Sequence, residues 1–196
     1  YDENLYYTEN TYRSRKNHLS SARFLLWTQN ETIQYYDIDS LDYADLLDGL
    51  NLDSFENIEL STEKFIVDYP DLMRRYDIRN RYELHNLLKK IIRDGEYHGF
   101  HSCRMPNIRF GNFDRNTAIL EILEEMSPVS ALDLATEISR EYGYDIATVE
   151  YTYLQPFAKY HHQGVYSVNQ KTMSSEHQEK LEKILTEDFY YFDEIR

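Results

Sequence analysis

The stretch YDIRNRYELHNLLKKI, from Tyr76 to Ile91, contains the clearest helical pattern in this chain of 196 residues. Two echoes of it occur, because YDIDSLDYADLLDGL starts at Tyr36 and YDIATVEYTYLQPF starts at Tyr144. Each copy of Tyr-Asp-Ile precedes a segment with helical apolar spacing. The triplet either marks the same turn in three related units or reflects chance in a chain with 19 tyrosines.

The central stretch predicts a helix over residues 80–92, followed by two short strands. The apolar residues of this helix recur every three or four positions, which places them on one buried face: Leu84, Leu87, Leu88 and Ile91. Asp94 and Gly95 end the helix. Residues 97–100 and 107–110 are then expected to form two short strands.

A second run of three helices and two strands follows. Residues 116–126 form the first helix, and Ser130 begins a second helix that Gly143 ends. The third helix spans residues 147–154, and two short strands flank Gln163 and Gly164.

The two ends of the chain predict further elements. Residues 13–27 predict a helix, a short helix follows Asp39 and Ser40, and residues 57–60 predict a strand. At the other end, Ser175 begins a helix with a capping-box pattern.

Three helices followed by a two-stranded hairpin is the order of a winged helix, and residues 61–169 resemble a tandem winged-helix protein of the helix-turn-helix superfamily. The resemblance implies a mostly α fold with small β-hairpin wings, built from tandem winged-helix-like units plus a C-terminal helix. In this fold each Tyr-Asp-Ile marks the turn before a third helix, with the isoleucine packed inward and the aspartate near the N-cap. We expect four parts: an acidic helical unit (1–60), a basic winged-helix-like unit (61–112), a second such unit (113–170) and a C-terminal helix (171–196).

Charge is distributed unevenly along the chain. The net charge is −14, which opposes nucleic-acid binding by the chain as a whole. Residues 24–63 contain ten acidic residues and no lysine or arginine, whereas residues 74–109 contain nine basic and four acidic residues. A local balance of +5 within an acidic chain points to a candidate phosphate-binding segment.

The expected helix 80–92 carries the candidate DNA-binding residues. Arg81, His85 and Lys89 are four residues apart and form one stripe, which Arg93 continues. The resemblance implies that this third helix enters the major groove. Flanking phosphate contacts are then expected from three further residues: Arg79, Arg104 and Arg109. The leading hypothesis is therefore a regulatory module that binds double-stranded DNA through its middle unit.

The alternative is that these cations solvate a helix surface or pair with the acidic first unit. The chain is then an acidic, Tyr-rich scaffold for protein–protein interaction within a larger protein, because tyrosine is favoured at interfaces. The best candidate contact for a protein partner or a homodimer is one cluster: Phe189, Tyr190, Tyr191 and Phe192. Its own alternative is ordinary packing of the last helix.

The sequence predicts no enzyme, cofactor or small-molecule substrate, because no phosphate loop, nucleophile elbow or H-E-x-x-H motif is present. His98, His101 and Cys103 are metal-capable, but without a clear fourth ligand an ordinary hairpin is favoured and no metal is expected. No apolar run reaches membrane-spanning length, so no membrane partner is expected. The single cysteine is typical of a cytoplasmic protein, and the start at Tyr1 suggests a piece of a longer chain.

Overall fold

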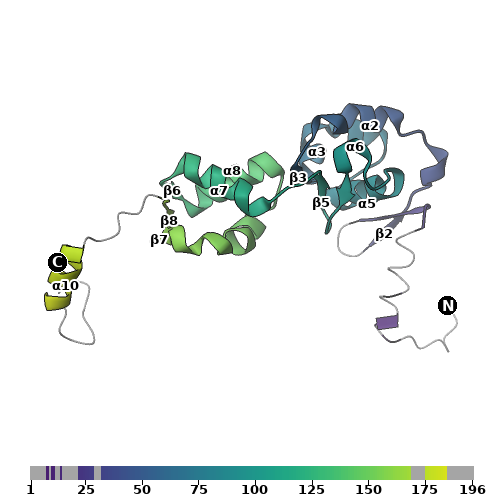
Figure 1. Cartoon of the computed structure of the whole chain (residues 1–196). Helices are drawn as coiled ribbons and strands as arrows, with labels where there is room; N and C mark the ends of the chain where they lie inside the picture. Colours follow the sequence, from purple (N-terminus) through teal and green to yellow (C-terminus); the bar gives the residue numbers. More distant parts are fainter. Residues whose placement is uncertain are drawn as a thin grey trace.

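The computed structural model describes residues 22–28, 32–168 and 175–184, together with residues 8, 10, 11 and 14. Within these ranges the chain is mostly helical, with three small antiparallel sheets (Figure 1). None of the helices in these ranges has the length and apolar character that crossing a bilayer requires.

The first unit, residues 44–110, is organised around a three-stranded sheet. Its strands are β3 (Ile58–Ser61), β4 (His101–Ser102) and β5 (Asn107–Phe110), and β5 lies in the centre. The helices of this unit are α2 (Ala44–Leu50), α3 (Glu63–Asp68), α4 (Pro70–Arg75) and α5 (Arg81–Ile91). The boundary expected after residue 60 falls inside β3, so part of the expected acidic unit shares a sheet with the basic segment.

Local sequence accounts for α5. The Asn80 side chain accepts hydrogen bonds from the backbone N–H groups of Tyr82 and Glu83, which satisfies two donors at the helix start. The expected apolar face is buried, with Leu84, Leu87 and Leu88 fully inaccessible. Burial of each leucine stabilises the fold by about 1.5–3 kcal/mol.

The second unit, residues 114–166, has a smaller sheet. Its strands are β6 (Val129–Ser130), β7 (His161–His162) and β8 (Val165–Tyr166), and β8 lies in the centre. Its helical elements are α7 (Arg115–Met126), α8 (Ala131–Tyr142), α9 (Ile146–Thr148), its π-helical continuation η4 (Val149–Tyr153) and the 3-10 turn η5 (Gln155–Tyr160). Ser130 caps α8 as expected, because its hydroxyl accepts from the N–H of Asp133. Gly143 ends α8 at a φ of +70°.

Both units follow the same order of elements. A helix leads into a strand, a run of helical segments follows (α3 to α6 in the first unit, α8 to η5 in the second), and two strands complete the sheet, with the last strand in the centre. The two units lie next to each other along the chain and in space (Figure 1).

Two expectations about secondary structure are wrong. Leu25–Trp27 is not the end of a helix but a strand, β1, which pairs with β2 (Ile33–Tyr35). Residues 97–100 are not a strand, because Glu96–Gly99 form a turn, α6, with Tyr97 and His98 at positive φ angles of 46° and 57°. The periodicity of apolar side chains indicates neither the pairing of β1 with β2 nor the left-handed turn at residues 96–99.

The Tyr-Asp-Ile triplets are only partly equivalent. Ile38 and Ile78 are buried as expected, but Ile146 is 38% exposed. Asp145 caps α9 through the N–H of Thr148, whereas α5 is capped by Asn80. The helix expected from Ser175 is present as α10 (Ser175–Ile184).

Candidate functional site

The structure removes His85 from the candidate DNA-binding stripe. This side chain is 2% exposed, and its Nε2 atom lies 3.2 Å from the carbonyl oxygen of Cys103 and 3.1 Å from that of Asn107. Burial lowers the pKa of His85 to about 4, so the ring is neutral at pH 7. The expectation that His85 reaches a DNA groove is therefore wrong, because the histidine instead fixes the β4–β5 loop to α5.

A second side of α5 is covered by the β1–β2 hairpin. The N–H of Trp27 donates to the Asn86 side chain at 3.2 Å, and the Lys90 ammonium donates to the carbonyl oxygen of Ala22 at 2.8 Å and to that of Leu25. Burial, assisted by nearby cations, lowers the pKa of Lys90 to about 8. Residues 83–88 are consequently all buried, which leaves only an edge of α5 in contact with solvent.

The other predicted cations differ in their availability. Arg79 is exposed but pairs with Asp77 at 2.9 Å, and Arg109 is half-buried on the sheet, opposite Glu59 of β3. Three exposed cations make no side-chain ion pair within the described ranges: Lys89, Arg93 and Arg104. Two aspartates of the acidic N-terminal segment form ion pairs with other arginines, Asp39 with Arg23 and Asp45 with Arg75.

A buried ionic network joins the two units. Glu59 of β3 is 6% exposed and accepts hydrogen bonds from Arg115, from the Tyr144 hydroxyl at 3.2 Å and from the Asn107 amide at 3.3 Å. The Arg115 guanidinium also lies 4.1 Å from the centre of the Tyr153 ring. Burial and the charge of Glu59 raise the pKa of Tyr144, so its hydroxyl remains a donor at neutral pH.

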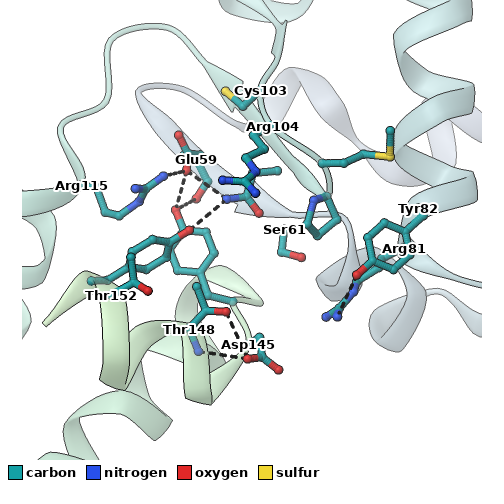
Figure 2. Close-up of a pocket in the computed structure, with 15 residues that line it drawn as sticks. Glu59, Ser61, Arg81, Tyr82, Cys103, Arg104, Arg115, Asp145, Thr148 and Thr152 are labelled. Atoms are coloured by element: carbon teal, nitrogen blue, oxygen red, sulfur yellow. Dashed lines mark hydrogen bonds and ion pairs between the residues drawn. The ribbon is translucent and has the colours of Figure 1, made fainter. Parts of the chain in front are cut away.

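Above this network lies a groove of about 680 Å³ between the units (Figure 2). Arg81 and Tyr82, at the start of α5, line one side of it, while Thr148 and Thr152 of the second unit line another. Arg104 enters it from the β4–β5 loop. The groove therefore brings together two of the seven predicted nucleic-acid residues, Arg81 and Arg104, from separate elements.

Arg81 and Arg104 have different surroundings in the groove. Arg81 forms an ion pair with Glu63, in which Nε lies 3.9 Å from the carboxylate, and its guanidinium lies 5.2 Å from the centre of the Tyr82 ring. Arg104 is exposed at the tip of its loop. Cys103 also lines the groove, and burial raises the pKa of its thiol, so it is protonated at neutral pH.

Sequence reasoning missed Glu59, Arg115 and the role of the second unit in the groove. The only local signal near Arg115 was the helix start at Asp114, which gives no hint of a partner 56 residues away. The predicted partner cluster, Phe189 to Phe192, lies outside the described residues. Within the described ranges, no group of three His, Cys, Asp or Glu side chains is arranged to hold a metal ion.

Comparisons with known proteins returned no matching family model, no matching curated protein and no matching solved structure.

Proposed function

We infer that the chain is a non-catalytic regulatory module of two tandem winged-helix-like units, which holds the phosphate backbone of double-stranded DNA. The observation that carries this proposal is the meeting of Arg81 and Arg104 at one groove between the units. A guanidinium group matches two phosphate oxygens with parallel hydrogen bonds, which makes arginine well suited to such a contact.

The order of elements supports the winged-helix part of the proposal. In each unit a helix and a strand precede a run of helical segments, and two strands complete a sheet with the last strand in its centre. In helix-turn-helix proteins the second helix of the motif lies in the major groove. In this chain the corresponding helix is α5, and the β4–β5 loop with Arg104 is the wing.

The burial of α5 favours contact with phosphates over contact with bases. His85 is buried and the β1–β2 hairpin covers Asn86, so the side chains at the centre of the helix cannot read base edges. Lys89 and Arg93 remain exposed along the open edge and would add phosphate contacts beside the groove. We therefore expect DNA binding with little sequence preference and strong salt dependence.

The test is fluorescence anisotropy with a labelled mixed-sequence duplex at low and near-physiological salt. We expect roughly micromolar affinity at low salt. The Lys89→Gln, Arg104→Gln double variant should weaken binding and reduce the slope of log K against log salt by about 0.9 for each lost contact. Both side chains are exposed, so the variant should fold normally.

Arg74→Gln is the matched control. Arg74 is also exposed, with 78% of its side chain accessible, but it pairs with Asp71 on α4 and does not line the groove. The control should bind as the unchanged protein does. Absence of binding at low salt, or an equal loss in the control, would contradict the proposal.

The competing function is that of a protein-interaction scaffold. The observation in its favour is the charge of residues 113–168, which include nine acidic and three basic residues. Tyr151 is also 76% exposed in this unit. If the chain does not bind the duplex at low salt, the protein-interaction function is favoured.

A further inference from the structure

The second unit contains a cavity of about 320 Å³ that is separate from the groove between the units. Its apolar lining comes from Leu154 and two small residues, Ala131 and Ala158. Leu154 is 1% exposed, whereas Ala131 is half-buried and Ala158 is exposed, so the two alanines supply the accessible apolar surface. A cavity of this size holds one long side chain but not a nucleotide pair.

Aromatic rings and one carboxylate complete the lining. Tyr151, Tyr166 and His161 all contribute, and the His161 and Tyr166 rings lie 4.6 Å apart. Glu150 lies beside them and is half-buried. Burial, followed by the negative charge of Glu150, raises the pKa of Tyr166, which is consistent with a carboxylate close to the rings.

The two sides of the helical turn η4 have different surroundings. On one side, the Arg115 guanidinium lies 4.1 Å from the centre of the Tyr153 ring, so this ring already has a cationic partner within the chain. On the other side, the Tyr151 ring is 76% exposed. No ring or cation of the described ranges contacts it. An exposed aromatic face beside a carboxylate attracts a cation with an aliphatic stem.

We propose that this cavity binds a lysine or arginine side chain of a partner protein, with the aliphatic stem against Ala131 and Ala158 and the cationic head between the Tyr151 ring and Glu150. A cationic partner also suits the unit as a whole, because acidic residues outnumber basic ones by nine to three over residues 113–168. The nearby Lys159 ammonium does not fill the role, since it lies 4.7 Å from the centre of the Tyr160 ring.

The same features disfavour a nucleic-acid occupant. Glu150 would repel a phosphate, and within the described part of the chain no lysine or arginine lines the cavity. The proposed site is thus independent of the DNA-binding proposal, and either can fail without the other. Loss of duplex binding in the Lys89→Gln, Arg104→Gln variant leaves this cavity unchanged.

The test is a heteronuclear NMR titration of the full chain with single-residue probes. The cationic probes are the N-methylamides of N-acetyl-lysine and N-acetyl-arginine, and the control probe is the norleucine analogue, which has a stem but no charge. We expect saturable shifts at Tyr151, Ala158 and His161 with at least one cationic probe at millimolar concentrations. The norleucine analogue should bind at least about twofold more weakly, which corresponds to the weaker end of cation–π energies.

Matched substitutions separate the cation–π contact from apolar packing and from bulk charge. Tyr151→Phe should retain affinity because the ring remains, whereas Tyr151→Leu keeps apolar area and should weaken binding by about three- to tenfold. Glu150→Gln should weaken binding, but Glu125→Gln, which removes an exposed charge outside the cavity, should not. Equal binding of norleucine, unchanged binding in Tyr151→Leu, or equal effects of the two glutamine variants would overturn the proposal.

Discussion

Removal of Arg115 should destabilise the fold more than its partial exposure suggests. The Arg115→Ala substitution leaves Glu59 as a carboxylate that is 6% exposed and keeps only neutral donors, among them the Tyr144 hydroxyl and the Asn107 amide, within the described residues. Loss of one partner from a fully buried ion pair costs about 3–5 kcal/mol, whereas loss of an exposed pair costs about 0–1 kcal/mol. Arg115 has 32% of its side chain accessible, so we expect a loss of about 2–3 kcal/mol in the free energy of unfolding.

Urea denaturation followed by far-ultraviolet circular dichroism measures this loss, provided that the slope of free energy against urea is unchanged. Arg140→Ala is the control, because Arg140 pairs with Glu137 within α8 and has 66% of its side chain accessible. The control should lose less than about 1 kcal/mol. Equal losses in the two variants would refute the view that a buried network joins the units.

A double substitution examines the cause of the loss. In Glu59→Leu, Arg115→Met no charge is left unpaired, so the variant should be more stable than Arg115→Ala alone. The Tyr144 hydroxyl and the Asn107 amide each lose one of two acceptors in this variant, which limits the recovery. A double variant that is less stable than Arg115→Ala would show that the hydrogen bonds to Glu59 outweigh the cost of its unpaired charge.

Three further predictions concern the first unit and the junction. Burial lowers the pKa of His85 to about 4 in the folded chain, while the value in the unfolded chain is near 6.5. The unfolded chain therefore binds more protons between these pH values, and the free energy of unfolding falls by up to about 3 kcal/mol as the pH drops from 6.5 to 4. Urea titrations of His85→Gln should lack this part of the pH dependence. Gly143→Ala should destabilise the fold by about 2–4 kcal/mol, because its φ is +70° and an added Cβ atom would lie 2.9 Å from the Cβ atom of Lys64. Gly164→Ala should cost only about 1–2 kcal/mol, because its φ is +83° but the space around it is open. Thermal denaturation of the two variants compares these costs. Asn86→Ala should cost about 1–3 kcal/mol and raise amide exchange in the β1–β2 hairpin, because the hydrogen bond between the Trp27 N–H and the Asn86 side chain is lost. Unchanged exchange in the hairpin would contradict the view that this bond holds it against α5.

Local physical chemistry made much of the helical structure predictable. The leucine spacing of α5, the Ser130 cap and the left-handed Gly143 each act within a few residues, so their consequences can be inferred from short stretches of sequence. The strand at residues 58–61 was likewise predicted nearly in place. The C-terminal helix followed from the capping pattern at Ser175.

Contacts between distant segments were not predictable in this way. The position of His85 beside Arg81 and Lys89 on a helix was correct, but its burial depends on the carbonyl groups of a loop about 20 residues later. In the same way, Asn86 meets Trp27 across 59 residues. Periodicity reports which side chains share a face, and it does not report what covers that face.

The covering of α5 changes what should be expected of a DNA-binding surface built on this fold. A helix that reads bases must offer several free side chains along its centre, and here residues 83–88 are all buried. The available cations lie at the margins instead: Arg81 and Arg104 in the groove, Lys89 and Arg93 along the edge. Cations at the margins attract phosphates wherever a duplex presents them, so affinity should depend strongly on salt and weakly on sequence. A marked preference for one duplex sequence at fixed salt would therefore require the β1–β2 hairpin to leave α5, and hydrogen exchange of Leu26, fully buried in that hairpin, would detect its departure.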